Sequence, residues 1–139
     1  MATGRVVDLI LPVPLHPARE RKRGFNQAQV IAEALSRATR LRLDCASLVR
    51  VGETTRHRAG MDAAQRANSL KGAFRVRAAR GVVNRRVLVV DDVMTTAATA
   101  NEVASSLLDA GAREVCVLTL ARVATAPLWG KRLALTKAD

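Results

Sequence analysis

The sequence predicts an α/β fold, namely a single domain built on a parallel sheet with flanking helices. Three apolar runs of strand length lie at residues 6–13, 87–90 and 115–120, and segments with helical patterns separate them. Apolar runs without polar alternation are typical of strands that are covered on both faces, as in a parallel sheet. Because strands and helices alternate along the chain, we expect right-handed crossover connections between the strands.

Caps and apolar stripes predict where the helices lie. Asn26 and Gln29 form a capping-box pattern, and an apolar stripe with helical spacing follows them. The same pattern beginning at Asp62 predicts a short helix that ends near Gly72. A third helix is expected over residues 99–110, and the glycine that follows it is its C-terminal stop.

Weaker segments complete the predicted organisation. Residues 46–51 are a candidate fourth strand, and residues 73–76 are a candidate short edge strand. Residues 52–61 are polar and basic, which predicts an exposed loop beside the sheet. We expect the domain to span residues 1–124 and residues 125–139 to form a C-terminal tail, because apolar patterning fades there.

The charge of the chain is strongly positive and unevenly distributed. The 139 residues contain 23 Lys and Arg against 12 Asp and Glu, a formal net charge of +11. Residues 1–86 hold 18 basic and 6 acidic side chains, so the whole excess lies upstream of residue 87. Most of the cations are Arg, whose planar fork suits phosphate oxygens. Polyanionic partners are therefore expected, although Arg enrichment also follows from genome composition.

Composition and cysteine usage exclude several classes of protein. A hydrophobic share of 49% with 25% charged residues is globular, which argues against disorder. No apolar run approaches the length of a membrane-spanning helix and no signal peptide is recognisable, so we expect a cytoplasmic protein without membrane insertion. Cys45 and Cys116 lie far apart in the sequence and predict no zinc site. Phe25, Phe74 and Trp129 are the only aromatic residues, so nucleic-acid binding would be mainly electrostatic and salt-sensitive.

The most informative motif follows the apolar run at residues 87–90. Asp91 and Asp92 come directly after that run, and threonines precede the predicted third helix. In open α/β sheets, ligands bind at the carboxyl ends of the strands. A helix N-terminus with nearby hydroxyl groups suits a phosphate, and adjacent carboxylates accept hydrogen bonds from sugar hydroxyls or hold a hydrated Mg²⁺ ion. The motif therefore indicates a sugar-phosphate site, the alternative being two acids that merely end a strand. The glycine-rich signatures of P-loop and Rossmann proteins are missing.

Residues 91–99 resemble the phosphoribosyl pyrophosphate-binding motif of type I phosphoribosyltransferases, which has two acids followed by Thr-Thr-Gly-Ala/Ser-Thr. Ala97 stands where that family usually has glycine, so a methyl group would weaken binding if the position required positive φ or close approach of the phosphate. The resemblance implies a type I phosphoribosyltransferase-like fold with the ribose hydroxyls at Asp91 and Asp92. The residues implied to hold the 5′-phosphate are Thr95, Thr96, Ala97, Ala98 and Thr99.

The N-terminal half resembles one branch of that superfamily, the competence protein F (ComF) family. The resemblance rests on Leu-Pro-Val-Pro-Leu-His-Pro at residues 11–17 and on the Arg-rich stretch with Gly-Phe-Asn-Gln at residues 19–27. It continues through parts of residues 60–74 and covers residues 8 to about 122. Members of the family commonly carry a cysteine-rich zinc module before this region. This chain shows none, which leaves either a shortened chain or a short member of the family.

The resemblance also implies roles for two basic segments. Arg19, Arg21 and Arg23 are candidate pyrophosphate-binding residues, because the loop after the first strand meets the pyrophosphate in the superfamily; a solvated charge run is the alternative. The superfamily has a flexible catalytic hood where this chain has its basic loop at residues 52–61. The basic residues there that would close over a bound pyrophosphate, or contact nucleic acid instead, are Arg56, His57 and Arg58.

The resemblance implies a phosphoribosyltransferase, that is, a glycosyltransferase that uses phosphoribosyl pyrophosphate with Mg²⁺. Asp91 and Asp92 are its candidate catalytic residues, because carboxylates stabilise an oxocarbenium-like transition state; neither is assigned as a direct metal ligand. The ComF branch further implies an association with competence machinery and DNA uptake in natural transformation. The alternative is a non-catalytic basic module that binds single-stranded DNA, and a regulatory homo-oligomer is a third reading.

Overall fold

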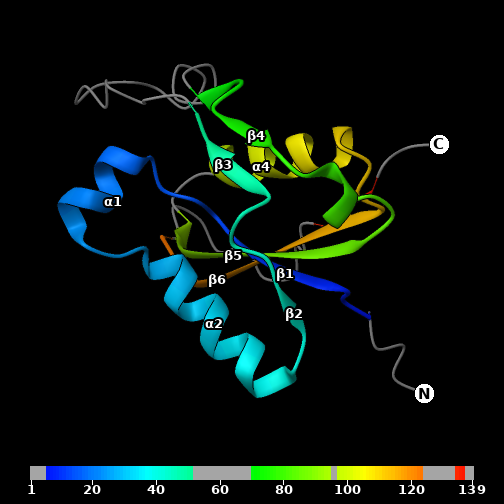
Figure 1. The fold of residues 1–139 in the computed structure, drawn as a ribbon, viewed down its shortest axis with the longest axis horizontal. Helices are drawn as coiled ribbons and strands as arrows, with labels where there is room; N and C mark the ends of the chain where they lie inside the picture. Colours follow the sequence, from blue (N-terminus) through cyan, green and yellow to red (C-terminus); the bar gives the residue numbers. More distant parts are fainter. Residues whose placement is uncertain (1–5, 52–69, 95–96, 124–133, 137–139) are drawn as a thin grey trace.

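The computed structural model describes residues 6–51, 70–94, 97–123 and 134–136. Its main sheet has five strands in the order β2-β1-β5-β6-β7 (Figure 1). The first four of these strands are mutually parallel, and β7 pairs antiparallel with β6. The predicted parallel-sheet α/β fold is therefore confirmed. The strands of this sheet are β1 (Leu9–Pro12), β2 (Arg42–Leu43), β5 (Arg86–Met94), β6 (Glu114–Arg122) and β7 (Ala134–Thr136).

Helices and a second, smaller sheet cover the main sheet. Helix α2 packs on β1 and β5 from one side, and α4 contacts β6 and the small sheet on the other (Figure 1). The small sheet consists of β3 and β4, which pair antiparallel. The elements are α1 (Pro17–Arg23), α2 (Gln27–Thr39), β3 (Leu48–Arg50), β4 (Phe74–Val76), the 3₁₀ turn η1 (Ala79–Gly81) and α4 (Ala98–Asp109).

The core has two layers, one on each face of the main sheet. Alternate residues of β1 and β5 point to opposite faces, as the period of a strand requires. Leu9, Leu11 and Val89 belong to the larger cluster with α4 and the small sheet, whereas Ile10 and Val90 belong to the cluster beneath α2. Strands β1 and β5 are buried on both faces, so they form a fixed base. Polar side chains follow where these strands end.

The predicted strands are confirmed, with two differences. The run at residues 46–51 forms β3, but β3 belongs to the small sheet rather than to the main one. The fourth parallel strand of the main sheet is β2, which the sequence did not reveal. Only two residues of β2 pair with β1, and so short a segment carries no apolar run that pattern reading can detect.

The observed helices can be compared with the predicted ones in the same way. Residues 17–23, expected as a loop, form α1, with Pro17 at its first position and the imidazole Nδ1 of His16 accepting a hydrogen bond from a backbone N–H. The predicted helix at residues 99–110 is α4, shifted by one residue, and Gly111 follows it with φ +104°. Asn26 caps α2 as predicted, but Gln29 bonds Glu33 instead of completing a capping box.

Two predicted segments lie wholly or largely outside the described residues. The basic loop and most of the helix expected from Asp62 fall within residues 52–69. In the predicted tail, the described residues are those of β7, which pairs with the start of β6. That pairing alone does not decide the boundary at residue 124, which stays a prediction.

Candidate functional site

A polar cavity of about 380 Å³ opens at the carboxyl end of the main sheet. Its walls come from the segment after β1, from α1, the start of α2, β3, the end of β5 and the start of α4. The carboxyl ends of parallel strands are where open α/β sheets bind ligands. Among the predicted site residues, those that line this cavity are Arg19, Arg23, Asp91, Asp92 and Thr99.

Two adjacent carboxylates form the acidic part of the cavity. The Asp92 N–H donates to Asp91 Oδ1 over 2.9 Å, and the Val93 N–H donates to Asp92 Oδ1 over 2.7 Å. Burial raises the pKa of Asp91 to about 6; the neighbouring Asp92 side chain adds to this rise, and Arg50 opposes it. A carboxyl group that titrates near neutral pH, in a cleft and beside a like charge, is typical of functional sites.

Arg50 is the cavity residue that sequence reasoning missed. It ends β3, and its guanidinium carbon lies 5.5 Å from the centre of the Phe74 ring on β4, within range of a cation–π contact. Burial lowers the pKa of the Arg50 guanidinium, Arg19 lowers it further, and Asp91 raises it. The guanidinium nevertheless remains charged. The available signal was a single cation that interrupts the apolar run at residues 46–51.

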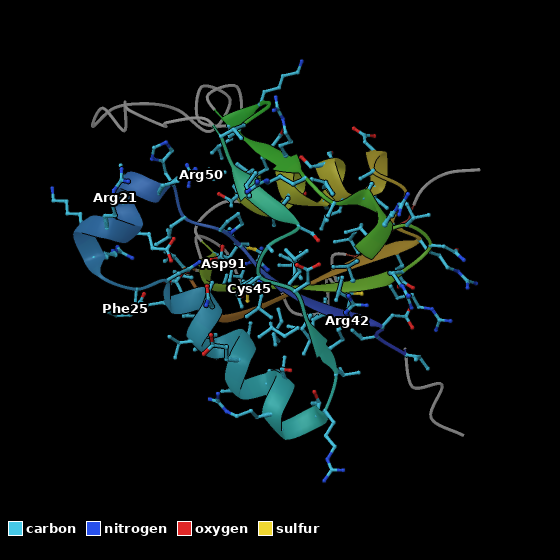
Figure 2. All side chains as sticks on the ribbon, in the orientation of Figure 1. Arg21, Phe25, Arg42, Cys45, Arg50 and Asp91 are labelled. Carbon is cyan, nitrogen blue, oxygen red and sulfur yellow. The ribbon has the colours of Figure 1, made fainter. Side chains whose placement is uncertain are left out.

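Helix α1 supplies two further cations to the cavity, because side chains one turn apart lie on the same side of a helix. Arg19 and Arg23 lie one turn apart and both line the cavity. Arg21 is exposed on the same helix and is not among the lining residues; Figure 2 shows it at the α1 end of the molecule. The geometry therefore favours Arg19 and Arg23 for a bound anion and separates Arg21 from them.

Asn26 joins the segment after β1 to the start of α2 at the edge of the cavity. Its side-chain Nδ2 donates to the Val13 carbonyl over 3.0 Å, and its Oδ1 accepts from the Ala28 N–H over 3.0 Å. The residue is 8% exposed. One buried side chain thus connects the segment after β1 to the start of α2. This connection fixes the positions of two walls of the cavity relative to each other.

The start of α4 also contributes to the wall of the cavity. Ala97 has φ −75°, so the alanine at this position needs no positive φ. Ala97 itself has no side-chain group that could cap the helix, and Thr99 in the first turn lines the cavity. Ala98 begins the helix without lining the cavity. The remaining predicted site residues lie outside the described residues; they are Arg56, His57, Arg58, Thr95 and Thr96.

The donor set suits a shared Mg²⁺ ion better than a protein-only metal site. Within the described ranges, no group of three or more His, Cys, Asp or Glu side chains is placed to hold a metal. Mg²⁺ prefers oxygen ligands and usually keeps several waters while binding one or two carboxylates together with substrate phosphates. Asp91 and Asp92 offer such oxygens at the cavity, so they fit a hydrated ion carried by a phosphorylated ligand.

Comparison with known protein families defines the class of protein to which the chain belongs. Residues 11–131 match the phosphoribosyl transferase domain. The chain therefore belongs to the phosphoribosyl transferase domain family. Within that family it falls in the ComF branch, as its similarity to curated relatives shows.

The relatives in that branch are bacterial and longer than this chain. The chain is 36% identical over 122 residues to Competence protein F of Haemophilus influenzae, which is 85% of this chain and 52% of that protein. It is 40% identical over 116 residues to DNA utilization protein YhgH of Escherichia coli O6:H1, covering 83% of this chain and 49% of the relative. The chain thus spans about half the length of these curated relatives.

Solved structures bear out the fold. The chain aligns with an allosteric regulatory enzyme of purine biosynthesis at TM-score 0.53 and 20% identity, over 84% of this chain and 22% of the enzyme chain. It aligns equally well, at TM-score 0.53 and 19% identity, with glutamine phosphoribosylpyrophosphate amidotransferase of B. subtilis, over 85% and 23% of the two chains. At these identities the likeness concerns the fold. Among the described residues, no helix combines the length and apolarity needed to cross a bilayer.

Proposed function

We propose that this domain binds phosphoribosyl pyrophosphate together with Mg²⁺ and acts as a phosphoribosyltransferase. The observation that carries the proposal is one polar cavity in which two carboxylates face three Arg side chains beside the start of α4. A sugar that bears phosphates at both ends needs this combination, because its hydroxyls require acceptors and its phosphates require cations and amides.

Each wall of the cavity has a proposed partner on the ligand. Asp91 and Asp92 accept hydrogen bonds from the ribose hydroxyls, and the pyrophosphate lies against Arg19 and Arg23. Arg50 joins these two cations, since it lines the same cavity and lies close enough to Asp91 to affect its pKa. The 5′-phosphate is assigned to the segment at residues 95–99, which leads into α4.

The same carboxylates supply the proposed catalytic effect. Breaking the bond between the ribose and the pyrophosphate develops positive charge on the sugar, and a nearby carboxylate stabilises that charge. Bound Mg²⁺ would neutralise the departing pyrophosphate. Asp91 Oδ1 accepts a hydrogen bond from the Asp92 N–H, and the nearby charge of Arg50 favours the ionised form of the carboxyl. The pair is therefore positioned before the ligand arrives.

Calorimetric titration of phosphoribosyl pyrophosphate into the protein tests the proposal. We expect saturable binding with Mg²⁺ that weakens when EDTA replaces the metal. The double variant Asp91→Asn/Asp92→Asn should lose about tenfold or more in affinity, because hydrogen bonds to charged groups contribute roughly 1.5–3 kcal/mol each. Arg19→Ala should weaken binding as well.

Lys22→Ala is the matched control, since it removes a cation from the same helix without touching the cavity. Its affinity should equal that of the unmodified protein. If the unmodified protein releases no heat up to millimolar ligand, the sugar-phosphate assignment is wrong.

The cellular setting proposed for this activity is DNA uptake. Relatives in the same branch are named for competence and for DNA utilization. The strongly basic N-terminal portion of the chain agrees with a polyanionic partner. The association with DNA uptake and the sugar-phosphate site are independent of each other, so each is tested by a different experiment.

A further inference from the structure

The small sheet brings Arg50 to the polar cavity although it is not paired to the main sheet. Among the described residues, β3 and β4 pair with each other and with no strand of the main sheet. Arg50 at the end of β3 nevertheless lines the cavity and lies close enough to Asp91 to affect its pKa. Contacts other than strand pairing must therefore set the position of this cation relative to the carboxylates of β5.

Helix α4 contacts both sheets. It packs against β6 of the main sheet and against β4 of the small one (Figure 1). Val103 and Leu107 of α4 belong to the same buried cluster as Leu48 of β3 and Phe74 of β4. Apolar packing is non-directional, so it holds the small sheet on the helix without fixing where along the helix the sheet lies. Hydrogen bonds are directional, and they can fix that position.

Glu102 on α4 makes such a hydrogen bond at the start of β4. Its Oε1 accepts from the Gly72 N–H over 2.8 Å. Gly72 lies in the turn that leads into β4 and has φ +75°, a conformation that favours glycine. One turn further along α4, the Ser106 Oγ lies 3.4 Å from the Phe74 carbonyl oxygen. Residues four apart lie on the same side of a helix, so both contacts come from one side of α4.

The hydrogen bond at Gly72 reaches Arg50 through the pairing of the small sheet. Phe74 follows Gly72 by two residues and is the direct cross-strand partner of Arg50. The Val51 N–H, next to Arg50, donates to the Ala73 carbonyl over 2.8 Å. The Arg50 guanidinium also lies over the Phe74 ring. The end of β3 is therefore fixed to the start of β4.

We propose that Glu102 is a positioning residue that fixes Arg50 in the polar cavity by holding the start of β4 on α4. Glu102 follows Thr99 by three residues and is not among the side chains that line the cavity, so it acts through Arg50 and not on a ligand. Helix α4 thus supplies one part of the wall directly, through Thr99, and locates another part through Glu102. The inference rests on the proposed function for its ligand, because the proposed function assigns the pyrophosphate to Arg50.

The direction of the expected effect separates positioning from simple electrostatics. Glu102 is an acid near a site proposed for anions, so its charge alone disfavours the ligand. If charge were the whole effect, removal of the carboxylate would strengthen anion binding. Loss of the hydrogen bond to Gly72 acts in the opposite direction, since Arg50 is then no longer held beside the ligand. Glu102→Gln distinguishes the two effects, because its amide oxygen still accepts the bond while the charge is gone.

Calorimetric titration of inorganic pyrophosphate with Mg²⁺ tests the inference. Arg50→Ala should weaken binding roughly tenfold or more, because it removes a charge-assisted contact. Glu102→Ala should weaken it about three- to tenfold, because it displaces the cation without removing it. Glu102→Gln should bind at least as tightly as the unmodified protein. Asp109→Ala is the matched control, since it removes an exposed carboxylate at the far end of the same helix, away from the cavity, and its affinity should be unchanged.

A double-mutant cycle shows whether Glu102 acts through Arg50. In the Arg50→Ala background, Glu102→Ala should weaken binding no further, because the cation that it positions is gone. The inference is overturned if the two losses add, as they would for a general loss of structure. It is also overturned if Glu102→Ala binds pyrophosphate like the unmodified protein, if Glu102→Gln loses as much as Glu102→Ala, or if the unmodified protein binds no pyrophosphate.

The inference and the proposed function fail in different ways. A protein that shows the expected pattern with pyrophosphate but gives no heat with phosphoribosyl pyrophosphate would keep the positioning role of Glu102 and lose the proposed activity. A protein that binds phosphoribosyl pyrophosphate, and whose Glu102→Ala variant binds both ligands unchanged, would keep the proposed function and lose the inference.

Discussion

At the scale of single residues, the site depends on the Asp91 carboxylate, whose burial costs folding free energy when it is ionised. Asp91 ends the buried part of β5 beside a second carboxylate, and burial raises its pKa to about 6. Arg50 lies near enough to oppose that rise, and its guanidinium lies over the ring of Phe74. A residue kept in so unfavourable a position points to a use for its charge rather than to a structural role.

The raised pKa of Asp91 predicts how stability changes with pH. The carboxyl group titrates near 3.8 in model compounds and about 6 in the folded chain, so the folded state prefers the protonated form. The contribution of this carboxyl to the free energy of unfolding therefore falls as pH rises from about 4 through 6, because the unfolded chain ionises first. Asp91→Asn should stabilise the protein at pH 7.5, and the gain should shrink towards pH 4. Urea unfolding at several pH values measures it.

Asp92→Asn at an adjacent position provides the comparison for that experiment. It removes the like charge next to Asp91, so it too should stabilise at pH 7.5. A gain for Asp91→Asn that stays constant from pH 4 to pH 7.5 would contradict the assignment of the raised pKa to this carboxyl.

At the scale of elements, the cavity depends on how the end of β1 is joined to the start of α2. Asn26 makes this junction, because its side chain donates to the Val13 carbonyl after β1 and also caps α2. Arg50 comes from the small sheet, which shares no strand pairing with the main one. The cavity is thus assembled from elements that side chains, rather than one continuous sheet, hold together.

Replacing Asn26 tests that junction. Asn26→Ala removes the cap of α2 and leaves the Val13 carbonyl without its side-chain donor, so the free energy of unfolding should fall by about 1–3 kcal/mol. Asn26→Ser should recover part of the loss, because its hydroxyl can still cap the helix. Asn101→Ala, at an exposed position of α4, should change stability by less than about 0.5 kcal/mol in the same urea titration. Equal effects at residues 26 and 101 would contradict the structural role of Asn26.

The same elements show what the sequence can and cannot predict. Long apolar runs predicted β1, β5 and β6. Asn26 predicted the start of α2, and Gly111 predicted the end of α4. Helix α1 was missed because it buries no residue and has no apolar stripe. Arg50 was missed because its place beside Asp91 arises from tertiary packing between strands distant in sequence.

At the scale of the whole molecule, the polar cavity is assembled from segments that are distant in the sequence. Its cations come from α1 and β3, its acids come from the end of β5, and Thr99 comes from α4. A ligand bound there would therefore contact several separate elements at once.

Transformation frequency tests the role of the sugar-phosphate site in the cell. In a competent host whose chromosomal copy carries Asp91→Asn/Asp92→Asn, we expect fewer transformants if the sugar-phosphate site acts in DNA uptake. Lys22→Ala, which does not touch the cavity, should leave the number unchanged. Normal frequencies in the double variant, with normal protein levels by immunoblot, would remove the proposed link to DNA uptake.

The two outermost strands of the main sheet are also its shortest. Strand β2 has two residues and β7 has three, whereas β5 and β6 have nine each. Short edge strands present few unpaired backbone groups of their own, but β7 pairs only with residues 114–116 of β6. Among the described residues, the rest of β6 therefore has no strand neighbour on that side. That part of β6 is the margin of the sheet to which an extended segment would add as a strand.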